Sequence, residues 1–368
     1  MASALQTNMY SLGFAEITEA LMALGHKRTL LLEGHMGIGK SSMLTDLARR
    51  MPDHTPCYFD CTTKDLGDIM IPNIQMLDGE GKFVKYLTNE EIGAHLDTPI
   101  ILMIDELGKA NRSVQNALRR AMLERKIGSY ELHPESIVFA TTNLGAENVG
   151  DLIEPHKRNA LVKVQVRKPT AEEWLVDFAV PNGLNHFVQA FVQEFPQVME
   201  SFENVKVPAD NPYIFHPQEY REAFVTGRSL HAASDILNTC GHLSRDALTG
   251  LLIGTIGVRA SMDLMTFVDL AHKLPSIKDI KANPEGADVP DTPSGVCMTV
   301  FKMLNAIPHD RELITPWFKY MKRLAKEPQA MFIQGVAKPH YPAHEWVTSH
   351  SQFGDWAISH SYLFHSDK

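Results

Sequence analysis

Residues Gly34 to Ser41 read G-H-M-G-I-G-K-S, which matches the pattern G-x-x-x-x-G-K-[ST] in full. The stretch follows an apolar run at residues 30–32 and precedes a segment of helical character at residues 43–50. Glycine lets the backbone approach a phosphate without a clash from Cβ, and successive N–H groups of such a loop point toward the anion. This loop predicts that the chain binds a nucleoside triphosphate.

Two side chains of the loop have predicted tasks of their own. The Lys40 ammonium would neutralise the β- and γ-phosphates, and the Ser41 hydroxyl would bind Mg²⁺. A glycine-rich turn with a chance lysine is the alternative, and the strand before the loop and the helix after it argue against that alternative. The predicted nucleotide-contacting residues are Gly34, His35, Met36, Gly37, Ile38, Gly39, Lys40, Ser41 and Ser42.

A second nucleotide signature is the apolar run at residues 100–104, which ends in the two carboxylates Asp105 and Glu106. Side chains alternate across a strand, so the two acids project differently and suit two separate tasks. Asp105 would hold Mg²⁺ through its water shell, and Glu106 would polarise the water that attacks the γ-phosphate. A solvated strand end is the alternative, which the phosphate loop upstream disfavours.

A further apolar run at residues 136–140 leads into Thr141, Thr142 and Asn143. A polar side chain at this strand end could orient the attacking water or sense the γ-phosphate. The alternative is an ordinary turn led by asparagine. We therefore take Asn143 as a candidate catalytic residue.

The order of segments predicts an α/β fold with a mainly parallel sheet, followed by helices. Five short apolar runs occupy residues 28–32, 56–60, 100–104, 136–140 and 161–166, and residues 111–125 form an amphipathic helical pattern between two of them. Helical patterns fill the chain from residue 170 to about 273, and residues 280–295 resemble an exposed connector. The predicted divisions are a nucleotide-binding domain at 1–168, a helical lid at 169–275, and a connector with a mostly helical extension at 276–368.

Composition restricts the class of protein. The 368 residues are 44% hydrophobic and 21% charged, as in a soluble globular protein, and no apolar run is long enough to span a membrane. Four irregularly spaced cysteines favour a reducing cytoplasm over a disulfide framework or a metal site. The net charge of −9 disfavours a surface that binds nucleic acid throughout, although a local basic channel stays open.

The ordered motifs resemble those of MoxR-type AAA+ ATPases, in the branch associated with von Willebrand factor A-domain partners. The resemblance covers residues 12–236 well and the C-terminal helices weakly. Beyond the phosphate loop, the matching motifs are DLGDIMIP at 65–72, GEGKF at 79–83, DELGKANR at 105–112, QNAL at 115–118 and RKIGSYEL at 125–132. The motifs at 65–72 and 79–83 resemble the hairpin that this group inserts in its second helix. The motif at 125–132 resembles the hairpin before sensor one, and the Thr-Thr-Asn of sensor one ends at Asn143.

The resemblance implies an AAA+ P-loop fold with a helical lid, an ATPase activity, and a ring, in this family a hexamer. It also implies two arginines: Arg158 matches the arginine finger that reaches the γ-phosphate of a neighbouring subunit, and Arg228 matches sensor two of the lid. Because the chain reads K-R-N where D-R-F is usual, Lys157 or Arg167 are alternatives to Arg158. Surface arginines are the bland alternative for both positions.

Three functions follow as hypotheses. The first is a motor that remodels a protein client, with a von Willebrand factor A-domain adaptor as partner by resemblance. The second is a nucleic-acid-translocating or clamp-handling motor, whose pore could have a basic lining of Arg119, Arg120, Arg125 and Lys126, with Lys82 and Lys85. The third is a scaffold that binds ATP with little turnover, which the presence of Glu106 disfavours.

Overall fold

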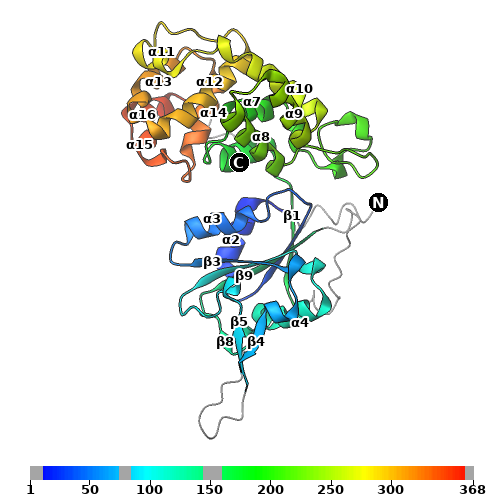
Figure 1. Ribbon diagram of the computed structural model, residues 1–368. Helices are drawn as coiled ribbons and strands as arrows, with labels where there is room; N and C mark the ends of the chain where they lie inside the picture. The colour runs from blue at the N-terminus through cyan, green and yellow to red at the C-terminus, as the bar shows by residue number, and fades with distance from the viewer. Residues whose placement is uncertain (1–10, 74–83, 144–159, 361–368) are drawn as a thin grey trace. The chain divides into compact units, whose positions relative to one another are not determined.

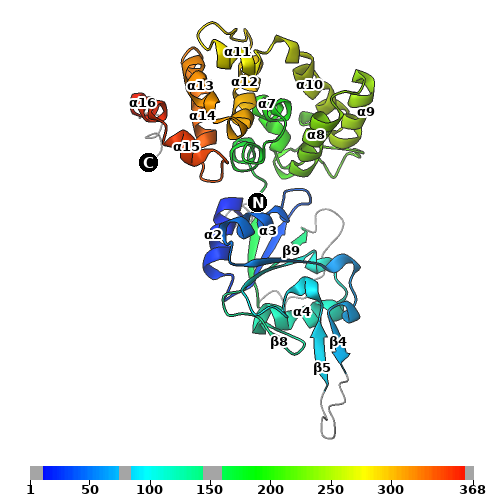
Figure 2. The same ribbon diagram turned by 60° about the vertical axis from the view of Figure 1, so that its left-hand side comes forward.

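The computed structural model describes residues 11–73, 84–143 and 160–360 (Figures 1 and 2). The chain divides into two compact units, Met1–Lys168 and Pro169–Lys368. No helix among the described residues is long and apolar enough to cross a membrane. Each unit has its own hydrophobic interior, and the phosphate loop lies in the first unit.

A parallel sheet of six strands forms the centre of the described part of the first unit. The strand order is β1-β10-β2-β9-β6-β3, and every neighbouring pair runs parallel. The three central strands β2, β9 and β6 are buried along their whole length, which explains why they read as continuous apolar runs. The strands are β1 (Ser11–Leu12), β2 (Leu30–Gly34), β3 (Thr55–Asp60), β6 (Ile100–Asp105), β9 (Ile137–Asn143) and β10 (Val162–Val166). The predicted fold class is confirmed.

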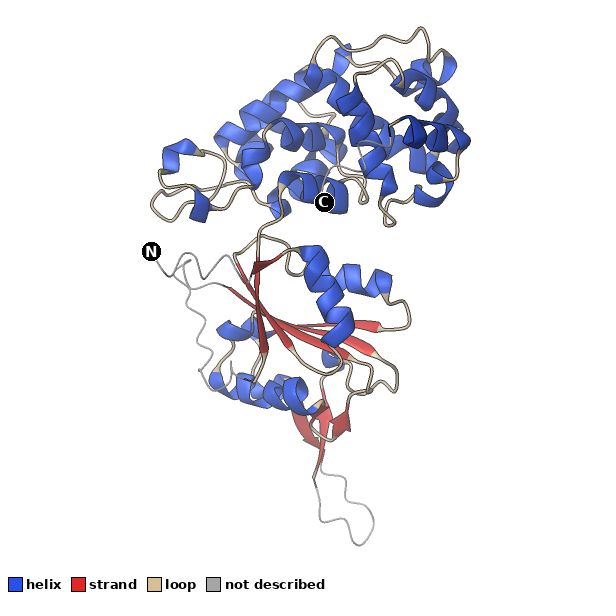
Figure 3. Ribbon diagram, turned by 180° about the vertical axis from the view of Figure 1, so that it is seen from behind, coloured by secondary structure: helices blue, strands red, loops and turns tan. Residues whose placement is uncertain are grey.

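Helices cover both faces of this sheet, so the first unit has three layers (Figure 3). Helices α2 (Phe14–Leu24) and α3 (Ser42–Arg50) lie on one face, where Leu21 packs in a core with Leu30 and Leu32 of β2. Helix α4 (Arg112–Glu124) lies on the other face, where Leu118 is fully buried. The amphipathic pattern predicted for residues 111–125 therefore marks a helix with one face on the sheet.

The first inserted hairpin pairs β4 (Met70–Asn73) with β5 (Lys85–Thr88) in antiparallel register. Ile71 lies opposite Leu87, and the side chains of both are exposed, by 61% and 39% respectively. The motif at 79–83 lies outside the described residues. The paired strands on either side of it agree with the hairpin that the resemblance implied.

The second hairpin pairs β7 (Lys126–Ile127) with β8 (Tyr130–Glu131) and rests on the first. The Ser129 backbone N–H donates to the Tyr86 carbonyl at 3.2 Å, and the Ser129 hydroxyl accepts from the Tyr86 N–H at 2.9 Å. Gly128 has a φ of 55°, and a Cβ there would lie 2.9 Å from the Tyr86 carbonyl oxygen. Glycine is therefore required where the two hairpins meet.

Arg125 joins three elements at the amino end of the sheet. It ends α4 in a left-handed conformation, with φ 57°. Its guanidinium donates to the Met122 carbonyl and the Thr29 hydroxyl at 2.8 and 2.6 Å, and to the Gly25 carbonyl at 2.8 Å. Burial lowers the pKa of Arg125 to about 10, so the side chain still carries its charge at neutral pH.

The second unit contains helices and no paired strands among its described residues, as predicted from the patterns after residue 170. It opens with a capping box in which the Thr170 side chain accepts from the Glu173 N–H. Its helices are α6 (Ala171–Trp174), α7 (His186–Glu194), α8 (Gly227–Cys240), α9 (Arg245–Ile256), α10 (Val258–Asp269), α11 (Ile277–Ala282), α12 (Pro293–Ala306), α13 (Ile314–Met321), α14 (Lys326–Ala337), α15 (His344–Thr348) and α16 (Ser351–Ser359).

The sequence prediction for residues 280–295 holds in part. Half of the residues in this segment are exposed, as expected of a connector, whereas Ile280 and Ala287 are buried and Gly295 lies in the first turn of α12. One hydrophobic core extends from Ala171 to Trp356 and includes both of the buried side chains. Pro284 and Gly286 lie in a turn, whereas Pro293 and Gly295 lie in the first turn of α12. The predicted division of the unit into lid and extension at 275/276 stays a prediction.

Candidate nucleotide-binding site

The phosphate loop connects the end of β2 to the start of α3. Gly37 and Gly39 have φ values of 71° and 98°, in the left-handed region that favours glycine. A Cβ on Gly34 would lie 2.5 Å from the side chain of Ile38 and 3.1 Å from that of Val166. The spacing of the glycines thus follows from how the loop folds back on the strand, and it leaves the backbone bare where an anion would approach.

Helix α3 begins directly after the loop. Ser41 occupies its N-cap and makes no capping hydrogen bond with its side chain, whereas the Ser42 hydroxyl donates to the Gly39 carbonyl at 2.6 Å. The amino end of a helix attracts anions because its first N–H groups lack partners within the helix. The predicted Mg²⁺ ligand Ser41 therefore lies at the positive end of α3.

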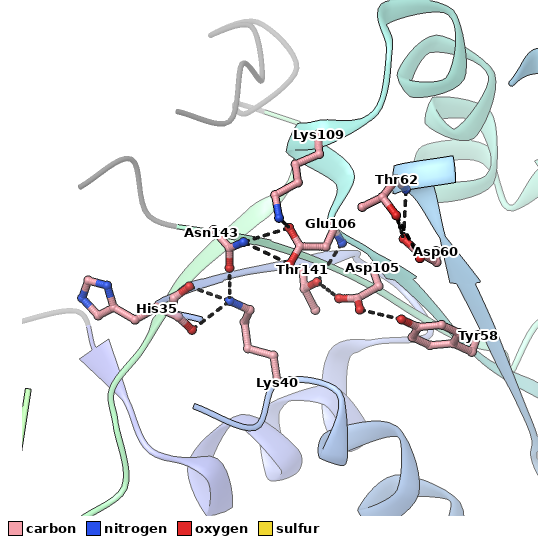
Figure 4. Close-up of polar contacts among 11 residues, drawn as sticks. His35, Lys40, Tyr58, Asp60, Thr62, Asp105, Glu106, Lys109, Thr141 and Asn143 are labelled. Atoms are coloured by element: carbon pink, nitrogen blue, oxygen red, sulfur yellow. Dashed lines mark hydrogen bonds and ion pairs between the residues drawn. The ribbon is translucent and has the colours of Figure 1, made fainter. Parts of the chain in front are cut away.

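Lys40 is the only lysine that is buried among the described residues, with 8% of its surface exposed. Its ammonium donates to the carbonyls of Gly34 and His35, at 2.5 and 3.1 Å, and to Oδ1 of Asn143 at 2.7 Å (Figure 4). A buried ammonium needs such partners because its desolvation is costly. Two of the three are carbonyls of its own loop, so the charge of Lys40 faces the space that the loop surrounds.

Asp105 ends β6 with both carboxylate oxygens hydrogen-bonded. The Thr141 hydroxyl donates to Oδ1, and the Tyr58 hydroxyl donates to Oδ2 at 2.8 Å (Figure 4). Burial and the neighbouring Asp105 carboxylate raise the pKa of Tyr58, so this phenol stays protonated and continues to donate. The carboxylate of Asp105 is therefore fixed in orientation from two strands, β3 and β9.

Glu106 follows in a conformation that is uncommon for a residue with a Cβ. Its φ is 54°, and its backbone N–H donates to the Thr141 hydroxyl at 3.1 Å. The Asn143 amide donates to both oxygens of the Glu106 carboxylate, at 3.0 and 2.9 Å, and the Lys109 ammonium lies 2.8 Å from Oε2. Strained backbone held by several contacts is frequent at functional sites.

Asn143 connects the two halves of the site. It ends β9, between β2 and β6 in the sheet, and it is 7% exposed. Its Oδ1 accepts from Lys40 while its Nδ2 donates to Glu106, so one amide bridges the phosphate loop and the carboxylate pair (Figure 4). The structure thus brings together the predicted residues Lys40, Asp105, Glu106 and Asn143. Their catalytic and binding roles are still predictions.

The predicted arginines lie outside the described residues, beside the start of α2, or in the second unit. Arg158 and its alternative Lys157 lie outside the described residues. Arg167 follows β10, and its guanidinium lies against Gly13 at the start of α2, 2.5 Å from where a Cβ of that glycine would be. Arg228 lies in the first turn of α8, in the second unit.

Three site residues were not singled out from the sequence: Tyr58, Lys109 and Thr141. Thr141 could have been found, because it lies two residues before Asn143 on the same strand and therefore on the same face. Lys109 reaches Glu106 only because the chain turns into a 3-10 helix, Leu107–Lys109, directly after that residue. Tyr58 is brought to Asp105 by the pairing of β3 with β6, which no local pattern reveals.

The oxygen donors at the site suit a hard divalent cation such as Mg²⁺. Asp105 supplies a carboxylate and Ser41 a hydroxyl, and Mg²⁺ prefers a few protein oxygens with water and phosphate as its other ligands. Each Asp105 oxygen already accepts one protein hydrogen bond and retains a lone pair. This arrangement is compatible with the predicted contact through the water shell of the ion.

Comparison with known proteins adds the family of the first unit. Residues 30–169 match the family model described as "ATPase family associated with various cellular activities (AAA)". This segment is an AAA ATPase domain, and the protein is accordingly an ATPase that binds ATP. No curated protein matches the chain.

Two solved structures with a similar course of the chain are both of RuvB from Thermotoga maritima. A mutant RuvB has 16% sequence identity, covers 73% of this chain and 76% of its own, and gives a TM-score of 0.35. The RuvB Holliday junction branch migration motor has 14% identity, covers 74% of this chain and 75% of its own, and gives a TM-score of 0.36. Both TM-scores are low, so these structures carry no information about what this chain acts on.

Proposed function

We propose that this AAA ATPase is a Mg²⁺-dependent, ring-forming motor of the MoxR type that uses ATP hydrolysis to remodel a partner protein. The observation that carries the proposal is the bridge from Lys40 through Asn143 to Glu106. It joins a lysine suited to binding phosphate to a carboxylate suited to polarising water.

In this proposal the loop residues from Gly34 to Ser42 surround the triphosphate, and Lys40 neutralises its charge. Ser41 and Asp105 would hold Mg²⁺, which supplies further positive charge to the phosphate oxygens. Glu106 accepts a hydrogen bond from the attacking water, and Asn143 orients that water or contacts the γ-phosphate. Catalysis of phosphoryl transfer is mainly positioning and charge stabilisation, and this set of side chains supplies both.

Assembly into a ring follows from the arginine finger. If Arg158 acts on the nucleotide of a neighbouring subunit, each site is completed only by a head-to-tail contact, and such contacts form a ring where the rotation between subunits closes. The resemblance to MoxR proteins favours a hexamer. Arg228, in the first turn of α8, would act as sensor two and relate the second unit to the state of the nucleotide.

The hairpins favour a protein as the partner. Ile71, Tyr86 and Leu87 expose 61%, 42% and 39% of their surfaces on the β4–β5 hairpin. Exposed apolar side chains that are clustered on one element are typical of protein-binding surfaces. The resemblance suggests an adaptor with a von Willebrand factor A domain. The net charge of −9 favours this reading over a nucleic-acid motor.

The test is ATP turnover by the purified chain, with Glu106→Gln as the trapping variant. We expect hydrolysis that requires Mg²⁺, and a turnover lower by about 100-fold or more in Glu106→Gln with ATP binding retained. Sedimentation of the ATP-bound variant should give a closed oligomer. Capture from the native host should then yield a protein partner.

Two outcomes would contradict the proposal. Equal turnover in the parent and in Glu106→Gln would remove this carboxylate from the reaction. A turnover that rises with single-stranded DNA, and loses that rise steeply as salt increases, would favour a nucleic-acid motor instead.

A further inference from the structure

Lys109 forms an ion pair with the carboxylate that the proposed function assigns to the attacking water. Its Nζ lies 2.8 Å from Oε2 of Glu106 (Figure 4). The same carboxylate accepts from the Asn143 amide on both of its oxygens. Glu106 is therefore held from two sides, by β9 through Asn143 and by the turn after β6 through Lys109.

The backbone explains why Lys109 is the residue that reaches Glu106. With φ at 54°, Glu106 turns the chain out of β6 into the short helix Leu107–Lys109. The N–H of Lys109 donates to the carbonyl of Glu106 at 2.9 Å, which sets the two residues one turn apart. In a helical turn the side chains of residues i and i+3 lie on the same face, so the ammonium meets the carboxylate.

The other charges at this edge of the sheet give the ion pair a wider electrostatic setting. Asp60 and Asp105 end neighbouring strands in register, and Glu106 follows directly, so three carboxylates gather where an anionic substrate would bind. Lys40 is directed to its own loop and to Asn143. Lys109 contributes positive charge on the carboxylate side of the site.

The polar contacts also distinguish the two oxygens of Glu106. Within the described part of the chain, Oε2 accepts from the Asn143 amide and forms the ion pair with Lys109, whereas Oε1 accepts from Asn143 alone. A carboxylate oxygen has two lone pairs, so Oε1 keeps one for a further donor. The contacts of Oε2 with Asn143 and Lys109 would prevent the carboxylate from rotating, so a water bound to Oε1 would keep a fixed position.

We propose that Lys109 is a positioning residue for ATP hydrolysis, which fixes the Glu106 carboxylate against Asn143 and leaves Oε1 to accept the attacking water. This inference rests on the proposed function of Glu106. It concerns turnover and not nucleotide affinity, because Lys109 contacts the carboxylate and the phosphate loop carries its own lysine. Misplacement of a catalytic group by a fraction of an ångström lowers the rate while leaving binding in place.

A plain surface ion pair is the alternative explanation. The side chains of Lys109 and Glu106 are 34% and 22% exposed, and ion pairs at such sites usually add little to stability. The two explanations differ in what a substitution changes. A surface ion pair predicts small effects on every quantity, whereas a positioning residue predicts a loss of kcat at constant KM.

The experiment compares Lys109→Met, Lys109→Arg and a matched control, Lys281→Met. Lys281 forms an ion pair with Asp310 at 2.7 Å in the second unit and is 37% exposed, close to the value for Lys109. We measure kcat and KM for ATP with saturating Mg²⁺, the affinity for a fluorescent ATP analogue, and the thermal midpoint of unfolding.

We expect kcat to fall about tenfold in Lys109→Met, with KM and affinity within about twofold of the parent. Lys109→Arg should recover kcat to within about threefold, because a guanidinium can replace the ion pair, and Lys281→Met should match the parent. In a Glu106→Gln background, Lys109→Met should cause no further loss.

An unchanged kcat in Lys109→Met overturns the inference, as does a kcat in Lys109→Arg that is as low as in Lys109→Met. An equal fall in Lys281→Met, or a full additional loss in the Glu106→Gln background, does the same. Absence of ATP turnover in the parent protein would instead refute the proposed function itself. The two failures are therefore distinguishable.

Discussion

Buried polar side chains serve different ends in the two units of this protein. In the first unit, Lys40, Asp105 and Asn143 lie together at the carboxyl ends of neighbouring strands and bind other side chains or the phosphate loop. In the second unit, Gln189 and Gln329 lie apart on α7 and α14, and each donates to a backbone carbonyl two residues before its own helix.

The buried amides of the second unit satisfy backbone carbonyls that would otherwise lack hydrogen bonds. Nε2 of Gln189 donates to the Leu184 carbonyl at 2.6 Å, and Asn305 on α12 donates to the same carbonyl at 2.6 Å. The Gln329 amide donates to the Leu324 carbonyl and accepts from the Trp356 indole at 2.7 Å. Buried carbonyls without a partner are costly, so these amides stabilise the loops that precede two helices.

This difference in hydrogen-bond partners distinguishes a ligand-binding site from a structural core. The buried amides of the second unit bind fixed backbone groups, and exchanging these partners for a ligand would bring no stabilisation. In the first unit the partners are themselves charged or are loop carbonyls beside bare glycines, so a phosphate or a water can replace one of them at low cost. We expect substitutions in the two networks to alter different measured quantities.

The largest expected effect is on nucleotide binding. Lys40→Met should weaken ATP binding by about 100-fold, equivalent to about 3 kcal/mol, because it removes the charged hydrogen bonds to the phosphates. Titration with a fluorescent ATP analogue measures the change. The free energy of unfolding of the first unit should change far less than the free energy of ATP binding. Binding as tight as in the parent would contradict the assignment of the phosphate loop.

The second effect should appear in stability alone. Gln189→Met keeps the volume of a fully buried side chain but removes its donor, and it should lower the free energy of unfolding by about 2 kcal/mol. Denaturant unfolding monitored by tryptophan fluorescence reports the change, since all four tryptophans (Trp174, Trp317, Trp346 and Trp356) lie in the second unit. ATP affinity should stay at the parental value. A loss of affinity comparable to that of Lys40→Met would remove the distinction between the two networks.

The smallest effect is expected at the edge of the first network. Tyr58→Phe removes the hydrogen bond to Oδ2 of Asp105, and it should raise the Mg²⁺ concentration for half-maximal turnover about fivefold, or about 1 kcal/mol. The effect is limited because Tyr58 is 44% exposed and water can take the place of its hydroxyl.

Direct binding of Mn²⁺ in the presence of nucleotide, followed by electron paramagnetic resonance, gives a second readout for Tyr58→Phe. Tyr220→Phe is the matched control, since Tyr220 is 91% exposed and should show no change. Equal metal affinities in Tyr58→Phe and the parent would indicate that the Tyr58 hydroxyl does not orient Asp105.

The sequence was sufficient for five of the six strands and for the main site residues, and it missed the two-residue strand β1 (Ser11–Leu12). Strands buried on both faces are apolar runs in the sequence, wherever each strand lies in the sheet. The loop at Gly34 to Ser41 and the adjacent acids Asp105 and Glu106 are recognisable because phosphate and metal binding require particular residues at particular spacings. Helix starts such as Thr170 were also visible, because a capping side chain must stand at a fixed offset from its partner.

What the sequence could not give depends on contacts between distant segments or on uncommon backbone. The left-handed conformation of Glu106, which brings Lys109 onto its carboxylate, has no signature in the residue types. The burial of Ile280 and Ala287 was missed because proline-rich turns read as exposed whether or not a core lies beneath them. The sequence after Lys338 lacks a clear period, and its described part, up to residue 360, contains the short helices α15 and α16.

At the amino end of the sheet, Arg125 forms a structural hydrogen-bond network, in contrast to the candidate nucleotide site at the carboxyl end. One guanidinium there joins the end of α4, the loop after α2 and the start of β2 through hydrogen bonds to Met122, Gly25 and Thr29. All three partner residues are buried. In amide hydrogen exchange, the backbone around Thr29 should therefore keep the same protection with and without nucleotide, and so provide an internal reference against which slowed exchange at the loop can be read.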